Sequence, residues 1–247
     1  MEVKDTRLAG KYHDKTVNRR RWVSVLGWAL IWGGVFIFGY LGWQLLGTDV
    51  VNARIQEEAS GSIDETLDAA REALPPVEEV DDDEGGTVEF FPEAAPGEGN
   101  QFGLLRVPAV GLEAVIFAGV SRETLKKGPG LIPGTPMPGQ PGNAVISGHR
   151  TTYGRPFYDF DLLRPGDRIE VETAIGVHVY EVRESFIVEP DDVWVTEDKP
   201  GGWLTLTTCN PKFSARERLI ISAELVEGPN LDYVKVLEER MEIPIAG

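Results

Sequence analysis

LTLTTCNP, residues 204–211, is the stretch of this 247-residue chain that decides the fold and points to the chemistry. Apolar and polar side chains alternate along it, which is typical of a β-strand with one buried face. The alternation places Thr207 and Cys209 on one face, and Leu204 and Leu206 on the other, toward a core. Cys209, the only cysteine of the chain, is therefore predicted to lie at the end of a strand.

Two other side chains that suit a reactive cysteine stand at the ends of predicted strands. His149 follows the apolar run at residues 143–147, and Arg218 precedes the apolar run at residues 219–226. A thiol reacts as the thiolate, so a nucleophilic cysteine needs a base or a cationic neighbour. A lone cysteine is more often a buried structural residue, but the three signals together favour a nucleophilic site.

Three motifs resemble those of the sortases, the membrane-anchored cysteine transpeptidases of Gram-positive bacteria, and occur in the same order. They are GHRTTYG at residues 148–154, TLTTC at 205–209 and RLII at 218–221. HRTTYG together with TLTTC-x-P is most similar to the class E group of actinobacteria. The resemblance covers residues 102–226 and leaves the first hundred residues to be interpreted separately.

The resemblance implies a role for each of the three residues. Cys209 would be the nucleophile. His149 would be the general acid and base that protonates the leaving amine and later deprotonates the incoming one. Arg218 would hold substrate carbonyls or stabilise the oxyanion with its fork of donors.

Three other residues compete for these roles. His13 precedes the long apolar segment described below, so it is expected on the other side of a membrane from Cys209. His178 lies within a predicted strand, where a histidine is more often a satisfied or exposed residue of a sheet. Arg216 would share a face with Arg218 in an extended chain, but the family's arginine directly precedes the last apolar strand, which favours Arg218.

Four neighbours of these residues are expected to shape the substrate site. Thr208 and Asn210 flank the nucleophile and would orient it or contact the substrate. Arg150 and Tyr153 follow the histidine and would line the cleft or pack beneath it. The resemblance also assigns residues 185–202 to the loop that covers the substrate peptide in sortases.

The second half of the chain has the pattern of a β domain. Short apolar runs separated by Gly- and Pro-rich turns favour a barrel or a sandwich. The resemblance implies a mostly β fold, a closed sortase-type barrel of about eight strands with short helices, as a catalytic domain at residues 100–227. The predicted strands are residues 103–107, 112–117, 143–147, 168–171, 177–188, 203–208 and 219–226. Helical turns are expected at residues 121–126 and 153–163, and a short helix at 231–241 within the C-terminal tail, 228–247.

A long uncharged segment, residues 22–46, precedes this domain. It exceeds the roughly 20 apolar residues that a helix needs to cross a membrane. A cleaved signal peptide has a shorter apolar region and a small-residue cleavage site, and a core helix rarely stays uncharged for so long, so one uncleaved transmembrane helix is favoured. Arginines 19–21 lie before the segment and Asp49 after it. By the positive-inside rule residues 1–21 would be cytoplasmic and the catalytic domain extracellular.

Residues 47–99 are expected to connect the anchor to the domain. Residues 49–74 carry helix-forming side chains, with apolar residues recurring at four-residue spacing, which predicts a juxtamembrane helix or a partly helical stalk. Pro75-Pro76 would end it. Residues 77–99 are acidic and rich in Pro and Gly, which predicts a flexible linker.

Composition excludes several other functions. The formal charge of −16 argues against a nucleic-acid-binding protein, which needs a basic face, although much of the charge lies in residues 78–98. A single cysteine cannot form an intrachain disulfide, and three widely spaced histidines with one cysteine give no zinc-ligand pattern. Neither a metal nor an organic cofactor is expected.

The function implied by the resemblance is cleavage of a C-terminal sorting motif between Thr and Gly, followed by transfer to an amine. The expected partners are exported proteins with such a motif, a peptidoglycan precursor that supplies the amine, and the membrane. Cys209 would carry the protein as a thioacyl intermediate. Class E resemblance implies a motif like Leu-Ala-x-Thr-Gly rather than Leu-Pro-x-Thr-Gly.

Two alternatives remain open on the sequence alone. One is another extracellular Cys/His enzyme, although papain-like enzymes place the cysteine before the histidine. L,D-transpeptidases carry Ser-x-Gly-Cys-x-Arg, which residues 207–211 do not match. The other alternative is a non-catalytic tethered β-barrel that binds a partner, with Cys209 buried. Rapid alkylation of the native thiol would favour an enzyme.

Overall fold

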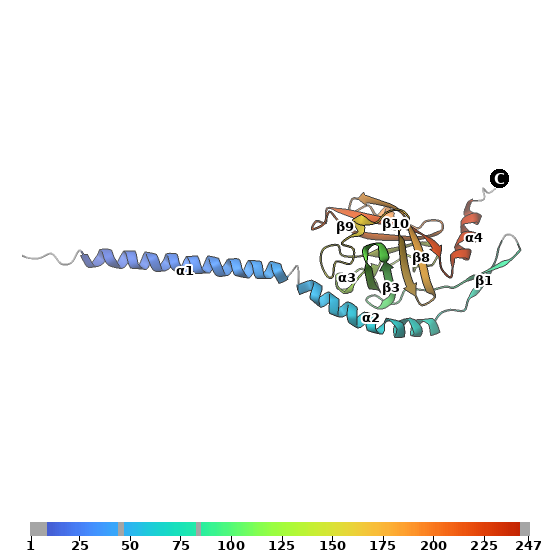
Figure 1. Cartoon of the computed structure of the whole chain (residues 1–247), viewed down its shortest axis with the longest axis horizontal. Helices are drawn as coiled ribbons and strands as arrows, with labels where there is room; N and C mark the ends of the chain where they lie inside the picture. The colour runs from blue at the N-terminus through green and yellow to red at the C-terminus, as the bar shows by residue number, and fades with distance from the viewer. Residues whose placement is uncertain (1–8, 44–46, 83–84, 243–247) are drawn as a thin grey trace, which may run out of the picture. The chain divides into compact units, whose positions relative to one another are not determined.

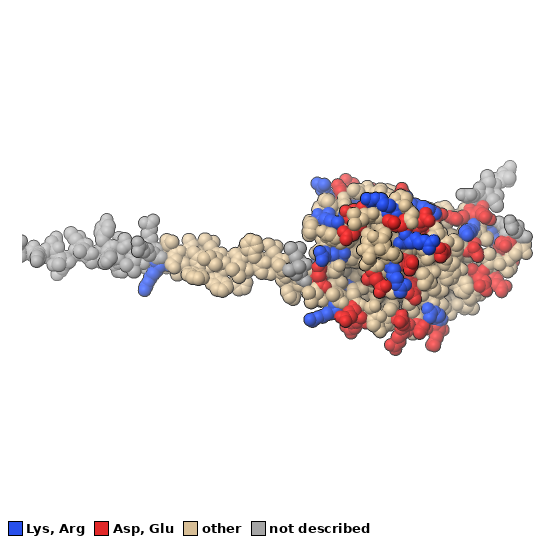
Figure 2. Space-filling model, viewed as in Figure 1, with Lys and Arg blue, Asp and Glu red and all other residues tan. Residues whose placement is uncertain are grey.

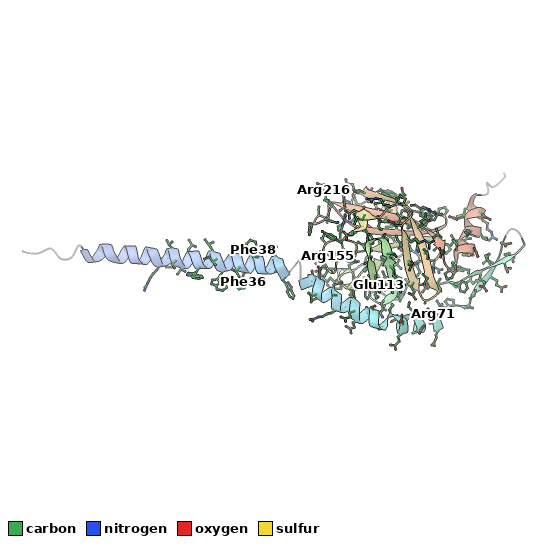
Figure 3. All side chains as sticks on the ribbon, in the orientation of Figure 1. Phe36, Phe38, Arg71, Glu113, Arg155 and Arg216 are labelled. Atoms are coloured by element: carbon green, nitrogen blue, oxygen red, sulfur yellow. The ribbon has the colours of Figure 1, made fainter. Side chains whose placement is uncertain are left out.

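The computed structural model describes residues 9–43, 47–82 and 85–242, and the chain divides into two units, residues 1–47 and 48–247. The first unit contains helix α1 (Ala9–Gly42). Within the described residues, Arg21–Gly42 is the stretch long and apolar enough to cross a membrane, and 0% of it is buried. Its surface is nearly free of charge in Figure 2, and Phe36 and Phe38 project from it in Figure 3. Helix α1 therefore contains a candidate membrane span, although a signal sequence near an N-terminus has the same properties.

The second unit is built around a closed barrel of eight described strands (Figure 1), in the order β10-β8-β7-β3-β4-β5-β6-β9. Their bounds are β3 (Gln101–Val107), β4 (Leu112–Ala118), β5 (Gly130–Leu131), β6 (Gly142–Ser147), β7 (Arg168–Thr173), β8 (Gly176–Val188), β9 (Gly202–Asn210) and β10 (Glu217–Glu227). Neighbours run antiparallel except for the parallel pairs β4–β5 and β6–β9. The predicted closed, mostly β barrel is confirmed. The two-residue β5 was not predicted, because it is too short to show alternation within its Pro- and Gly-rich loop.

Alternation along the strands sorts side chains into a barrel interior and an outer wall. Leu204 and Leu206 of β9 are completely buried in the main core, together with Ile221 and Ala223 of the adjacent β10. Burying a side chain of the size of leucine contributes about 1.5–3 kcal/mol. The core therefore fixes which face of β9 is turned inward, and Cys209 lies on the other face.

Helix α2 (Thr48–Glu72) packs on the outside of the barrel and is an element of its own rather than a partly helical stalk. Ala59, Ile63 and Leu67, spaced four residues apart, form a second apolar cluster with side chains of β3 and β4. In Figure 1 the helix runs along the barrel beside β3. It ends shortly before Pro75-Pro76, as the sequence predicts.

The acidic segment after α2 contains regular structure. Strands β1 (Glu78–Asp81) and β2 (Thr87–Phe90) pair as an antiparallel hairpin. The ring of Phe90 stacks on Tyr233 with centroids 4.3 Å apart, and the Phe91 N–H donates to Asn230 Oδ1 at 2.8 Å. Composition predicts a flexible linker, whereas the structure attaches residues 87–99 to the barrel. The difference arises because the Phe90 ring and the Phe91 backbone make contacts with distant residues that the acidic composition hides.

Short helices connect the strands. They are η2 (Pro108–Val110), α3 (Arg122–Lys127), η3 (Phe160–Leu162), η4 (Val193–Thr196) and, after the barrel, α4 (Leu231–Glu242). Ser121 caps α3, because its Oγ accepts from the Thr124 N–H at 3.2 Å. The expected helices at residues 121–126 and 231–241 are present. In the expected helical region 153–163, the helical part is η3 alone.

Candidate active site

Three adjacent strands bring the predicted residues to the same end of the barrel. In the parallel pair of β6 and β9, Ser147 lies beside Thr207. His149 follows Ser147 by two residues, just as Cys209 follows Thr207. In the antiparallel pair of β9 and β10, Cys209 lies directly beside Arg218. The register therefore places the backbone positions of His149 and Arg218 on either side of Cys209 in the barrel wall.

Cys209 belongs to the outer wall of the barrel. Directly paired residues of neighbouring strands point to the same face, so Cys209 and Arg218 share a face opposite to the buried Leu206. The cysteine is free and only half-buried. Its thiol is not sealed in the core, which argues against a purely structural cysteine.

The loop that carries His149 is bonded to the strand that carries the cysteine. The Gly148 N–H donates to the Thr207 carbonyl at 3.1 Å, and Thr208 Oγ1 donates to the Gly148 carbonyl at 2.7 Å. The Tyr153 ring lies 5.1 Å from the His149 ring, centroid to centroid. Burial lowers the pKa of His149 below its usual value and so favours the neutral ring. Thr208 is buried and bonds the histidine loop, and its role in substrate binding stays a prediction.

Arg150 joins the loop that follows His149 to the end of β9. Its side chain is only 3% exposed, and its Nη1 donates to Asn210 Oδ1 at 2.6 Å and to the Cys209 carbonyl at 3.3 Å. Its Nε donates to the Tyr158 carbonyl at 3.4 Å, and its Nη2 forms an ion pair with Asp161 Oδ1 at 3.0 Å. The guanidinium is engaged in these contacts, which favours the packing role over contact with a substrate.

The two candidate arginines are placed differently. Nη1 of Arg218 donates to the carbonyls of Ala215 and Glu217, both at 2.9 Å, so these bonds use two of the five guanidinium donors. The side chain of Arg216 is 74% exposed, with Nη2 3.5 Å from Glu217 Oε1, and Figure 3 labels it at the surface. The arginine beside Cys209 is therefore Arg218.

The rival histidines lie elsewhere. His178 is completely buried near the start of β8, with Nε2 3.1 Å from Thr173 Oγ1, and burial lowers its pKa to about 4. A Cβ on Gly139 would come within 2.0 Å of its ring, so glycine is required there. Arg218 pairs with Val188 at the far end of β8. Ten residues of strand, about 33 Å, separate Val188 from His178, so His178 lies far from Arg218. His13 belongs to the separate N-terminal unit.

The loop between β8 and β9 is attached to the outer wall of the barrel at β6 and at β8. Nδ2 of Asn143 in β6 donates to the carbonyls of Val195 and Glu197 at 3.1 and 2.9 Å. Trp194 stacks on Phe186 of β8 with centroids 5.7 Å apart. Phe186 pairs with β10 two residues beyond Arg218, so this loop borders the arginine side of the site.

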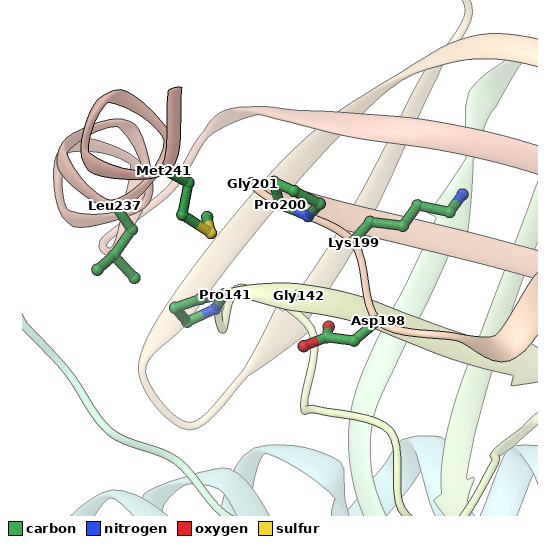
Figure 4. Close-up of a pocket in the computed structure, with 8 residues that line it drawn as sticks. All are labelled: Pro141, Gly142, Asp198, Lys199, Pro200, Gly201, Leu237 and Met241. Carbon is green, nitrogen blue, oxygen red and sulfur yellow. The ribbon is translucent and has the colours of Figure 1, made fainter. Parts of the chain in front are cut away.

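A cavity of about 360 Å³ lies at the other end of β9 and is drawn in Figure 4. Its lining residues come from the start of β6, from the loop that precedes β9 and from α4, and they are Pro141, Gly142, Asp198, Lys199, Pro200, Gly201, Leu237 and Met241. Eight residues of strand separate Gly201 from Cys209, or about 26 Å. This cavity is therefore not part of the cysteine site.

Sequence reasoning missed the partners that hold the site together. Tyr158 and Asp161 bind Arg150, and Asp49 of α2 binds the turn after His149. None of them lies at a spacing that signals contact. Among the described residues, no group of three or more His, Cys, Asp or Glu side chains is arranged to hold a metal ion. A reaction without a cofactor stays a prediction.

Comparison with known proteins identifies relatives of this chain. The family model described as Sortase domain matches residues 105–226. Sortase SrtE1 of Streptomyces coelicolor is 35% identical over 150 residues, which are 53% of this chain and 42% of that protein, so the chain spans less than half of the relative's length. Sortase D of Bacillus subtilis is 29% identical over 185 residues, covering 74% of this chain and 86% of that protein.

Among solved structures, sortase E1 from Streptomyces coelicolor, with a tripeptide in its active site, is 32% identical with a TM-score of 0.50. The match covers 55% of this chain and 92% of that one. Nearly the whole of the solved class E structure is thus matched, in sequence as well as in fold. This chain belongs to the sortase family and is similar to its class E members.

Proposed function

We propose that this chain is a membrane-anchored cysteine transpeptidase that joins exported proteins to an amine of the cell wall. The observation that supports the proposal is the strand register at one end of a sortase-family barrel, where Cys209 pairs with Arg218 and Ser147, two residues before His149, pairs with Thr207. The half-buried state of the free thiol supports it.

The first step forms a thioester. Sγ of Cys209 gives its proton to His149 and attacks the threonine carbonyl carbon of the sorting motif. The C–S bond forms, and Arg218 stabilises the negative charge on the carbonyl oxygen. The C–N bond to glycine then breaks, and His149 returns the proton to the leaving amine. The lowered pKa of His149 supports this role, because the imidazole is neutral and ready to accept the proton.

The second step releases the enzyme. An amine nitrogen attacks the thioester carbonyl, and the amine proton passes to His149. The new C–N bond forms as the C–S bond breaks, and the thiolate of Cys209 recovers a proton from His149. One amide bond is exchanged for another, so no oxidant, reductant or cofactor is consumed.

We propose a Leu-Ala-x-Thr-Gly-like motif as the substrate and a peptidoglycan-precursor amine as the acceptor. Similarity to class E sortases supports the motif. A sortase C of Clostridium perfringens, 28% identical with a TM-score of 0.50, was solved with the C-terminal cell wall sorting motif. In this chain the exposed side chains of Val193 and Trp194, beside the arginine side of the site, offer apolar surface to an extended peptide.

The proposed arrangement puts this chemistry outside the cell. Residues 1–21 would be cytoplasmic, residues 22–46 the transmembrane segment, of which 44–46 lie outside the described residues, and residues 47–99 the connection. Residues 100–227 would be the extracellular catalytic domain, and residues 228–247 a C-terminal tail. The uncharged stretch of α1 and the arginines before it support this orientation.

The proposal is tested by incubating the full-length protein, in detergent, with a Leu-Ala-x-Thr-Gly peptide and a small amine. Mass spectrometry should detect the peptide cleaved after threonine and joined to the amine. Cys209→Ala should form no product. If the wild-type protein gives neither cleavage nor amine product with Leu-Ala-x-Thr-Gly and Leu-Pro-x-Thr-Gly peptides, the proposed function is wrong.

A further inference from the structure

The turn that follows His149 has an unusual backbone. Tyr153, Gly154 and Arg155 have φ angles of +52°, +77° and +52°, so all three lie in the left-handed region. This conformation is unfavourable for a residue that carries a side chain. Such a conformation persists only where surrounding contacts hold it. The turn therefore needs support from outside its own sequence.

Helix α2 supplies this support from its first turn. Oδ1 of Asp49 accepts from the Gly154 N–H at 3.0 Å, and Oδ2 of Asp49 forms an ion pair with Arg155 Nε at 3.0 Å. Arg155 is labelled near the start of α2 in Figure 3. One carboxylate thus binds a backbone donor and a side chain of the strained turn at the same time.

Asn52 closes the contact one turn further along α2. A Cβ on Gly154 would lie 2.0 Å from Asn52 Oδ1, so the turn approaches the helix closely enough to require glycine. Asn52 is buried, and its Nδ2 donates to the carbonyls of Lys126 and Lys127 at 2.8 and 2.9 Å. Because α3 holds this end of α2, Asp49 is presented to the turn from a fixed position.

The 153–155 turn is also in contact with His149. The Tyr153 ring packs against the His149 ring, and the Phe157 N–H donates to the His149 carbonyl at 3.2 Å. A shift of the turn would therefore move His149 relative to Cys209.

We propose that Asp49, supported by Asn52, is a positioning residue for the transpeptidation reaction and holds His149 at the cysteine through the 153–155 turn. The inference rests on the proposed function. It makes the segment directly after the candidate membrane span a part of the active-site support rather than a passive connection. A catalytic domain that begins at residue 100 would lack it.

The test compares variants of the full-length protein in the transpeptidation assay. Asp49→Ala should lower kcat about tenfold with KM changed less than twofold, because the turn acts on the histidine and not on the substrate. Asp49→Asn keeps an acceptor for the Gly154 N–H and should lose about threefold. Glu57→Ala, which removes an exposed carboxylate from the same helix, is the matched control and should match the wild-type protein.

A double-mutant cycle separates positioning from general destabilisation. Asp49→Asn and Arg155→Ala remove the same ion pair, so the double variant should be no slower than the slower single variant. Multiplied losses in kcat would show that the two residues act independently and would overturn the inference. The inference would also be overturned if Asp49→Ala and Glu57→Ala had the same kcat.

Amide hydrogen exchange gives a readout that needs no activity. The Gly154 amide should exchange about tenfold faster in Asp49→Ala and stay protected in Asp49→Asn. Unchanged exchange in Asp49→Ala would refute the support of the turn. An inactive wild-type protein with this exchange pattern would instead refute the proposed function, so the two failures are distinguishable.

Discussion

The guanidinium of Arg150 connects the cysteine loop to the histidine loop, and its removal is the sharpest perturbation that the structure offers. Arg150→Ala deletes the bonds to the Cys209 carbonyl, to Asn210 Oδ1 and to the Tyr158 carbonyl, together with the ion pair to Asp161. The Asp161 side chain is 43% exposed and can be rehydrated, whereas the acceptors beneath the site lose a buried donor.

The magnitude follows from these contacts. A hydrogen bond to a charged group contributes about 1.5–3 kcal/mol, and breaking a fully buried ion pair costs about 3–5 kcal/mol. Because one partner can be rehydrated, we expect Arg150→Ala to lower the free energy of unfolding by about 3 kcal/mol. Arg150→Lys should lose about 2 kcal/mol, because an ammonium cannot reach acceptors on both loops at once.

The assay is urea denaturation of the full-length protein, paired with the transpeptidation rate at a temperature where the variants stay folded. The kcat should fall at least about tenfold in Arg150→Ala, because the loops of Cys209 and His149 lose their common support. Arg168→Ala, which breaks an exposed ion pair with Glu227, is the control and should cost less than about 1 kcal/mol. The reasoning is refuted if Arg150→Ala stays within 1 kcal/mol and twofold in kcat of the control, both roughly the error of such measurements.

Three further predictions address single contacts. Arg218→Ala should lose transpeptidation at least about a hundredfold in kcat while Arg216→Ala keeps most of it, and a reversed result in the peptide assay would mean that the wrong arginine was chosen. Thr208→Val, which removes the bond to the Gly148 carbonyl, should lower the free energy of unfolding by about 1–2 kcal/mol, measured in urea; no change would show that this bond contributes nothing. His178 has a folded pKa of about 4, below the usual 6.5, so protons bind the unfolded state more readily. Stability should therefore fall by about 1.5 kcal/mol from pH 6.5 to pH 5, and pH-dependent urea titrations should show this fall absent in His178→Gln; equal slopes would contradict it.

Local patterns in the sequence were sufficient for seven of the eight barrel strands. Period-two alternation in residues 204–208 gives the inward face of β9, because a strand buried on one face leaves that signature wherever it occurs. The long uncharged run at residues 22–46 is equally local, since the length that a membrane requires is read directly from the chain. Strand β5 was not predicted, because two residues cannot show a period-two alternation.

Contacts between segments far apart in the chain could not be predicted from such local patterns. The parallel pairing of β6 with β9 joins residues 60 positions apart, and Arg150 reaches Asn210 over the same separation. The sequence offered Arg150 as a possible cleft residue, but only its burial shows that it lies beneath the site. Asp49 gave no signal beyond its charge, because its partners, Gly154 and Arg155, are more than a hundred residues away in the chain.

The acidic segment shows how composition can hide structure. Residues 78–98 carry enough charge to predict disorder, yet Phe90 and Phe91 attach the segment to Tyr233 and Asn230. Mean composition averages over a stretch, whereas the segment is attached by one aromatic stack, of Phe90 on Tyr233, and by a backbone hydrogen bond of Phe91.

The central claim is that Cys209 is a reactive thiol within a peptide-binding site, and the most direct measurement is its rate of alkylation in the native protein. Because Cys209 is the only cysteine, every modification maps to it without ambiguity. We predict that iodoacetamide modifies the native full-length protein without prior unfolding, and that a Leu-Ala-x-Thr-Gly peptide slows this reaction. The account would be contradicted if the thiol resisted alkylation until the protein unfolded and if the peptide left the alkylation rate unchanged.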